Sequence, residues 1–152
     1  MKYRDLLAEW WEGYRGELVD TTRHKKEGEM QVHILPALGD NDVQDTTREV
    51  LQKYVEDKQK HGSPIRHPQG LKPATIICHF HIIKPSLDLA VEKGMIAKNP
   101  CSEVNLPKIE DREVSVFKNQ DAKRLISFAR PKWFGDIILL AYHTGMRRVF
   151  GG

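Results

Sequence analysis

Cysteine is scarce in this sequence of 152 residues, and no motif organises it. The two cysteines, Cys78 and Cys101, lie far apart, and neither belongs to a Cys-x-x-Cys pair. A disulfide framework or a zinc knuckle needs cysteines at paired spacings. We therefore expect no disulfide scaffold, no bound metal and no cofactor. A reducing, cytoplasmic location is the expectation for such a chain.

Long hydrophobic runs are also missing. The N-terminal segment MKYRDLLAEWWEGYRGE is charged throughout and has no apolar core of the length that a signal peptide needs. No uninterrupted apolar run reaches the length of a membrane span, so no membrane partner is expected. Hydrophobic residues make up 39% of the chain and charged residues 30%, which is typical of a packed soluble core.

The chain has little excess charge of either sign. The formal net charge is +3, and residues 1–107 hold 15 Lys and Arg against 16 Asp and Glu. Residues 108–152 hold 9 against 5 and are therefore basic. Overall basicity cannot support a nucleic-acid partner here, so any such interpretation depends on local basic patches.

Helical periodicity dominates the front of the chain. Residues 3–18 carry one apolar stripe at spacings of three and four, which includes Trp10 and Trp11, and we interpret both tryptophans as core residues. Another helix is predicted over residues 45–61, with Gly62 as its stop signal.

The helix between these two has a weaker pattern. Asp20 or Thr21 is expected to cap its start, and its sparse apolar stripe runs toward Ile34. Gly28 in its middle lowers helix stability. Residues 33–39 are expected to end the helix, because Pro36 cannot continue the hydrogen-bond ladder and Gly39 permits a turn.

The strongest pattern begins at Pro73, which suits the first turn of a helix that Gly94 ends. Pro85 is expected to kink this helix. The predicted buried face recurs at spacings of three and four and comprises Ile76, Phe80, Ile83, Leu87 and Ala90.

The remaining sequence begins with a linker at residues 99–112, which hold two prolines. A short strand is predicted over residues 113–117. A helix follows from residue 118 or 119 until Pro131 breaks it. The last helix, residues 133–144, is apolar nearly all round and needs burial on several sides.

Three segments resemble parts of phage-integrase-type tyrosine recombinases. Residues 33–40 (HILPALGD) are similar to the turn between the second and third helices of the family's core-binding domain. Residues 89–100 (LAVEKGMIAKNP) are similar to the end of that domain's fourth helix and the start of its linker. Residues 144–148 (TGMRR) resemble the motif that presents the first catalytic arginine. The order of the segments also fits, and the resemblance covers residues 3–148.

The resemblance implies a mainly α fold. Residues 1–107 would form a four-helix, SAM-like core-binding domain, and residues 108–152 the start of an incomplete α+β catalytic domain. The implied function is the DNA-binding part of a phage integrase, which acts in DNA integration and recombination for a mobile element. The implied partner is double-stranded DNA at an attachment or core site. We expect this chain to be a monomer, whereas a full-length relative acts as a tetramer on DNA.

The family's chemistry needs more residues than this sequence holds. Its tyrosine attacks a phosphodiester, and arginines stabilise the negative charge of the transition state with paired hydrogen bonds. By resemblance Arg147 is the first of these arginines, and Arg148 is its neighbour. The family's lysine, His-x-x-Arg segment and tyrosine nucleophile follow later and are missing here, and Phe150 departs from the motif. We therefore expect a truncated chain that does not cleave DNA alone.

Two helices carry the candidate DNA contacts. A basic cluster opens the second helix, and phosphate contacts or an ordinary solvated charge run explain it equally well. The family's often basic positions on the fourth helix are Ile77 and Cys78 here, which lowers the expected affinity. A metal site at Cys78, His79 and His81 is rejected because these side chains point in different directions on a helix, and His79 is expected to be packed. The candidates are Thr22, Arg23, His24, Lys25, Lys26, Lys72, Thr75, His81 and Lys84.

Two other interpretations stay open. In the first, the chain is a helical protein-interaction module without a nucleic-acid role. In the second, it is the non-functional remnant of a disrupted integrase gene. Salt-sensitive binding of a DNA duplex separates the DNA-binding interpretation from the interaction module, because neutralisation of phosphates makes affinity fall with salt. Limited proteolysis tests the remnant, which predicts cleavage within residues 100–118 and a stable N-terminal piece.

Overall fold

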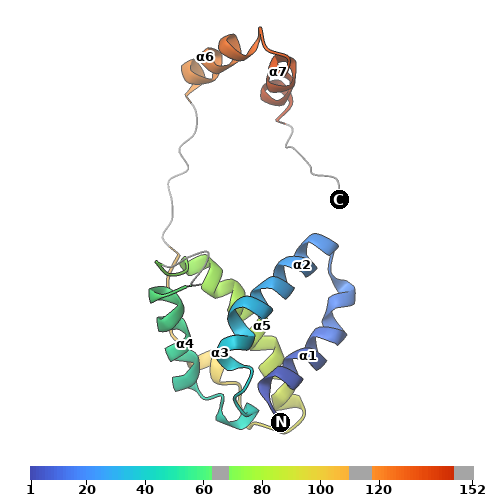
Figure 1. Ribbon diagram of the computed structural model, residues 1–152, viewed down its shortest axis with the longest axis vertical. Helices are drawn as coiled ribbons and strands as arrows, with labels where there is room; N and C mark the ends of the chain where they lie inside the picture. Colours follow the sequence, from blue (N-terminus) through green and yellow to red (C-terminus); the bar gives the residue numbers. More distant parts are fainter. Residues whose placement is uncertain (63–68, 110–117, 146–152) are drawn as a thin grey trace. The chain divides into compact units, whose positions relative to one another are not determined.

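The computed structural model describes residues 1–62, 69–109 and 118–145 (Figure 1). It divides into two compact units, Met1–Glu110 and Asp111–Gly152, and each is considered by itself. The described residues are mainly helical and contain no strand, only an isolated bridge between Lys2 and Asp42. The predicted strand at residues 113–117 lies outside the described residues.

The first unit is built around its last long helix. Helix α5 (Pro73–Glu92) lies between α1 (Tyr3–Tyr14) and α4 (Arg48–Lys60), as Figure 1 shows, and packs against both. All five residues of its predicted apolar face are buried, which confirms that prediction. Pro85 lies inside the helix, and the predicted kink there stays a prediction. By length and composition alone α5 passes as a membrane span, but its buried face accounts for its apolar residues.

Helix α1 carries the predicted apolar stripe. Tyr3 and Leu6 are fully buried, Trp11 is buried, and Trp10 packs against the core from its edge. Core packing is therefore confirmed for these tryptophans. The helix ends at Tyr14, earlier than predicted, and a 3₁₀ turn follows over Arg15–Glu17.

The prediction that Pro36 ends the second helix is wrong. Helix α2 (Asp20–Glu29) continues through a π-helical turn (Met30–Ile34) into α3 (Leu35–Leu38). The Leu35 amide donates to the carbonyl of Met30, five residues back, instead of four. This wider turn directly precedes Pro36, which occupies the first turn of α3, where a missing N–H donor is tolerated.

Gly39 and the following residues end this helical stretch. Gly39 has ordinary right-handed backbone angles, but a Cβ atom there would lie 2.6 Å from the carbonyl oxygen of Leu35. Close approach of the backbone therefore favours glycine at this position. A 3₁₀ turn (Val43–Asp45) then leads to α4, which begins at Arg48, three residues later than predicted.

The first half of the predicted linker belongs to the first unit. Pro100–Glu103 form a 3₁₀ turn that packs against α4 and α5, and Cys101 within it is buried. The Arg48 side chain donates to the carbonyl of Glu103 at 2.9 Å, and the Asn105 amide donates to the side chain of Gln52 at 3.0 Å. These bonds show that the chain leaves the unit only after this point.

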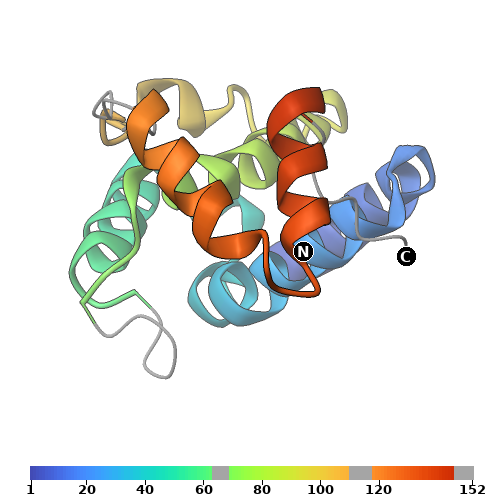
Figure 2. The same cartoon turned by 90° about the horizontal axis from the view of Figure 1, so that it is seen from above.

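The second unit holds two described helices, α6 (Asn119–Ala129) and α7 (Gly135–Thr144), which pack against each other (Figure 2). Both match the predicted helices, and α7 ends at Gly145, which has a positive φ of 65°. Burial is sparse among the described residues of this unit, where only Ala129 and Gly135 are buried. The exposed apolar residues are Leu125, Phe128, Trp133, Ile137, Leu140 and Tyr142.

Candidate nucleic-acid interface

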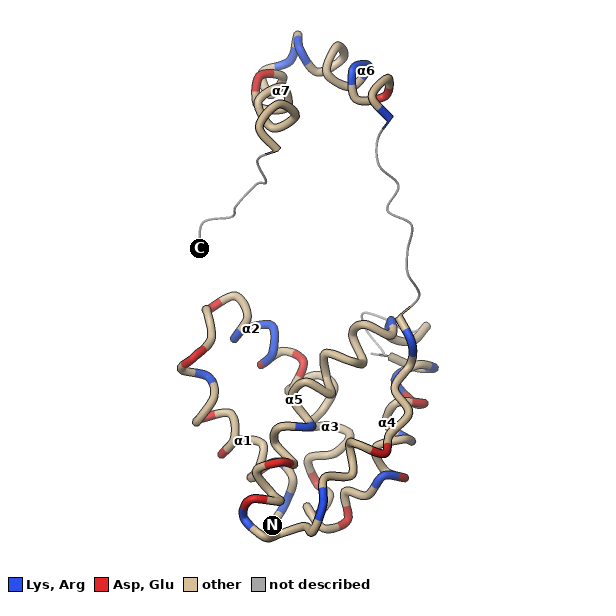
Figure 3. The backbone as a smooth tube through the Cα atoms, turned by 180° about the vertical axis from the view of Figure 1, so that it is seen from behind, with Lys and Arg blue, Asp and Glu red and all other residues tan. Residues whose placement is uncertain are grey.

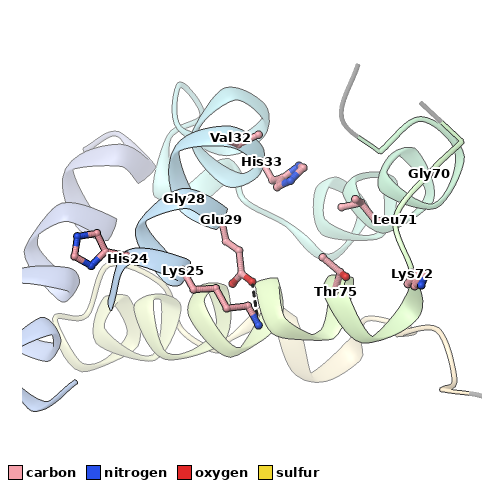
Figure 4. A pocket seen from close by; sticks show the side chains of 10 residues that line it. All are labelled: His24, Lys25, Gly28, Glu29, Val32, His33, Gly70, Leu71, Lys72 and Thr75. Carbon is pink, nitrogen blue, oxygen red and sulfur yellow. Dashed lines mark ion pairs between the residues drawn. The ribbon is translucent and has the colours of Figure 1, made fainter. Parts of the chain in front are cut away.

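An open groove runs between α2 with its π turn and the start of α5 (Figure 4). Its volume is about 640 Å³. Basic, acidic and apolar side chains share its walls, so it is more polar than a typical pocket for a small apolar ligand. Its lining residues are His24, Lys25, Gly28, Glu29, Val32, His33, Gly70, Leu71, Lys72 and Thr75.

The far wall of the groove is attached to α4 by its backbone. The Leu71 amide donates to the carbonyl of Lys58 at 2.7 Å, and the Leu71 side chain is buried. Gly70 adopts a φ of 97°, and a Cβ atom there would collide with the backbone of Gln59. Glycine at this position therefore allows the segment before α5 to lie against α4 and to carry Lys72 to the groove.

The groove includes part of the predicted basic cluster on α2. His24 and Lys25 line it, whereas the cluster's other three members do not. Arg23 forms an ion pair with Asp20, and Lys26 lies 5.5 Å from the centre of the Tyr14 ring. Thr22 is exposed outside the groove. Figure 3 shows acidic residues interleaved with the basic ones along the described backbone of this unit.

The candidates on α5 are also divided. Lys72 and Thr75 line the groove at the start of the helix. His81 is exposed two turns further along, and Lys84 forms an ion pair with Asp88 at 3.2 Å. The structure therefore brings four of the nine candidates together in one groove, two from each helix. Arg147 lies outside the described residues.

Glu29 and His33 are groove residues that sequence reasoning missed. The signal was present, because Lys25, Glu29 and His33 recur at intervals of four, which places them on one face of a helix. The Glu29 side chain is only 12% exposed, and a carboxylate oxygen lies 3.9 Å from the Lys25 ammonium nitrogen. Burial raises the pKa of Glu29, while the positive charges of Lys25, Lys26 and His81 oppose the shift.

A buried polar cluster lies behind the groove. The Tyr54 hydroxyl and Nδ1 of His79 are 2.8 Å apart, and the His79 ring stacks on His33 with centroids 4.9 Å apart. His79 is fully buried, as predicted. Burial, followed by the nearby His33 and Lys58, lowers the pKa of His79 to about 4, so its ring is neutral at pH 7.

The four tyrosines are committed to other contacts. Tyr3 is fully buried, and its hydroxyl lies 2.8 Å from that of Ser86, while burial raises the pKa of Tyr54. Tyr14 stacks on Trp10, and Tyr142 on α7 donates to Asn119 at 3.3 Å. Deprotonation of a buried tyrosine is unfavourable, so neither Tyr3 nor Tyr54 suits nucleophilic attack.

These features define a small helical domain with a partly basic groove, and two comparisons find matches among known proteins. Residues 2–59 match the model of the phage integrase N-terminal SAM-like domain. A protein described as tyrosine recombinase XerC-like, from Caldanaerobacter subterraneus subsp. tengcongensis, is 29% identical over 89 residues. No solved structure matches the chain significantly. Both matches support a relationship of this chain to the phage integrase, or tyrosine recombinase, family.

The family-model match covers the front of the molecule. The family model extends from the start of α1 nearly to the end of α4, and so includes the α2 wall of the groove. The alignment with the recombinase covers 54% of this chain and 22% of the relative. The chain therefore aligns with about a fifth of that relative's length. Together the two matches support a recombinase-type DNA-binding part.

Proposed function

We propose that the Met1–Glu110 unit binds the phosphate backbone of double-stranded DNA through the groove between α2 and α5. The observation that carries the proposal is the meeting of Lys25 and His24 from α2 with Lys72 and Thr75 from α5. These side chains lie far apart in the sequence, yet they offer cationic and hydroxyl donors along one channel. Such donors suit phosphate oxygens, which supply most of the affinity in protein–DNA complexes.

The expected affinity is modest. Residues 1–107 have slightly more acidic than basic residues, and several cations near the groove already pair with carboxylates, among them Arg23 and Lys84. Lys72 forms no ion pair among the described residues, so it is the cation most ready for a phosphate. Few phosphate contacts mean a weak interaction that salt readily dissociates.

We propose further that this stretch of 152 residues does not cleave DNA by itself. Its four tyrosines have the contacts described above, and Tyr3 and Tyr54 are shielded from solvent. Arg147 alone would position a phosphate without a nucleophile or a proton donor. A nicked attachment-site duplex should therefore yield no covalent protein–DNA adduct on a denaturing gel. An adduct that Tyr142→Phe abolishes would contradict this proposal.

Three further proposals concern the DNA target, the cellular location and the oligomeric state. We propose an attachment or core site of a mobile element as the DNA target, a cytoplasmic location, and a monomeric state for this chain away from DNA. Light scattering of the free protein tests the last of these, and a dimer mass at micromolar concentration would contradict it.

Fluorescence anisotropy of a labelled duplex tests the DNA proposal. Binding at about 50 mM salt should weaken at least tenfold at about 200 mM, since each neutralised phosphate releases counterions. Lys72→Ala should weaken binding several-fold and make the salt dependence shallower. Lys53→Ala is the matched control, because Lys53 is exposed on α4 away from the groove.

Two results would overturn the proposal. Equal losses for the Lys72 and Lys53 variants would mean that the groove is not the binding surface. No binding by the wild-type protein at low salt would favour a helical protein-interaction module or a remnant without function.

A further inference from the structure

We propose that Glu29 is an internal competitor of the DNA phosphates: it occupies the groove with a negative charge, lowers DNA affinity, and takes up a proton when DNA binds. This inference rests on the proposed DNA-binding function and adds a regulatory property to the same site. Nothing in the motif that identifies the basic cluster requires an acid at this position.

The geometry places the carboxylate inside the proposed phosphate path. Figure 4 shows Glu29 and Lys25 extending from α2 toward α5, with Thr75 and Lys72 on the opposite wall. The Glu29 side chain is 12% exposed, whereas that of Lys25 is 69% exposed. The carboxylate of Glu29 is therefore mostly shielded from solvent, whereas the ammonium group of Lys25 is accessible to a phosphate.

The ion pair within the groove is loose. The 3.9 Å between Lys25 and Glu29 exceeds ordinary hydrogen-bond length, so the carboxylate lacks the short contact that compensates a buried charge. Glu29 partly neutralises the charge of Lys25 but does not fix the position of its side chain through a hydrogen bond. A phosphate that approaches Lys25 must compete with the Glu29 carboxylate for the positive charge of the lysine.

Charged groups from three elements surround this carboxylate. On α2 they are Lys25 and Lys26, and His81 on α5 adds a positive influence that favours the ionised form. Tyr54 on α4 lies within electrostatic reach of Glu29, and His24, His33 and Lys72 line the same groove. Burial nevertheless raises the pKa of Glu29, so protonation is already easier than in water.

A bound phosphate would strengthen this tendency. It brings a second negative charge beside the carboxylate, and like charges at short range disfavour ionisation. The pKa of Glu29 should therefore be higher in the complex than in the free protein. Linkage requires DNA affinity to rise as pH falls through the pKa of the complex toward that of the free protein, with one proton taken from solvent by the carboxyl group.

Glu29→Gln tests the inference because glutamine keeps the shape and removes the charge. Its DNA affinity, measured by anisotropy at low salt, should exceed that of the wild type by about five- to tenfold at about pH 8. The ratio should shrink toward one at a lower pH that protonates the wild-type carboxyl group.

Glu27→Gln is the matched control. It removes the same charge from the same helix, but Glu27 lies in a separate hollow against α1. It should change affinity less than twofold at either pH. Glu29→Ala is a second test of the charge effect, and circular dichroism checks that each variant keeps the wild-type helix content.

The outcomes separate this inference from the proposed function. If the wild type binds DNA and Glu29→Gln gains no more than Glu27→Gln, the competitor role is wrong and DNA binding stands. A weaker Glu29→Gln complex would show that the carboxylate positions Lys25 for DNA, which also overturns the inference. If Glu29→Gln gains the same affinity over the wild type at both pH values, the proposed proton uptake is wrong. Failure of both proteins to bind overturns the DNA-binding function and this inference with it.

Discussion

The two units of this protein use apolar side chains in different ways. In Met1–Glu110 the large apolar residues of α1, α4 and α5 are mostly inside one core. In the described part of Asp111–Gly152, Trp133 is 88% exposed and Phe128 is 70% exposed. Within that described part, α6 and α7 cover little of each other's apolar surface, whereas several helices around α5 enclose a common centre. Apolar composition alone therefore does not make a core.

The largest expected effect tests this contrast directly. Leu87→Ala in α5 should reduce the free energy of unfolding by about 3 kcal/mol, because Leu87 is fully buried and the change leaves a cavity. Ile137→Ala in α7 should cost less than about 0.5 kcal/mol, because Ile137 is 62% exposed. Urea denaturation followed by circular dichroism measures both. Similar costs for the two variants would remove the distinction between the units.

A pH effect of about the same size is expected from His79 in the first unit. The pKa of His79 is about 4 in the folded protein against about 6.5 when unfolded, so the unfolded chain binds a proton first. Stability should therefore fall as pH drops from about 6.5 to about 4, by about 3 kcal/mol in total. His79→Gln should flatten this part of the pH profile. An unchanged slope in that variant would assign the acid sensitivity to other groups.

The smallest expected effect concerns the attachment of the segment around Asn105, near the C-terminal boundary of the first unit. Gln52→Ala removes the side-chain acceptor of the Asn105 amide and should cost about 0.5–1 kcal/mol, since the bond is exposed. The same change should speed hydrogen exchange at Asn105, which local opening controls. Gln59→Ala, also on α4, is the control because its side chain has no such partner among the described residues. Equal exchange rates in wild type and variant would mean that this segment is not attached through Gln52.

Local patterns predicted the helices that have one clear apolar face. The five positions predicted for the buried face of α5 are all buried, because a strong apolar stripe favours one orientation of the helix. The π turn before Pro36 was not predictable by the same reasoning. Proline favours the end of a helix locally, and the surrounding packing here selects a wider turn that keeps the helix going.

The candidate interface was predicted in part for a related reason. Basic residues on α2 and at the start of α5 were identified individually, but which of them meet depends on how two distant helices pack. Ion pairs removed Arg23 and Lys84 from the available set, and these pairs also follow from positions of neighbouring carboxylates. Glu29 was not predicted because only basic and hydroxyl side chains were considered as phosphate contacts. Its burial in the groove depends on the packing of α2 and α5.

The sequence by itself determined the helical class, the apolar stripes and the resemblance to integrases, since these depend on short-range spacing and local motifs. Tertiary structure decided the course of the chain through Pro36, the docking of Pro100–Glu103, the burial of His79 and the composition of the groove. Each of these depends on contacts between residues far apart in the chain. Packing energy at such contacts exceeds the local preferences that a sequence pattern records.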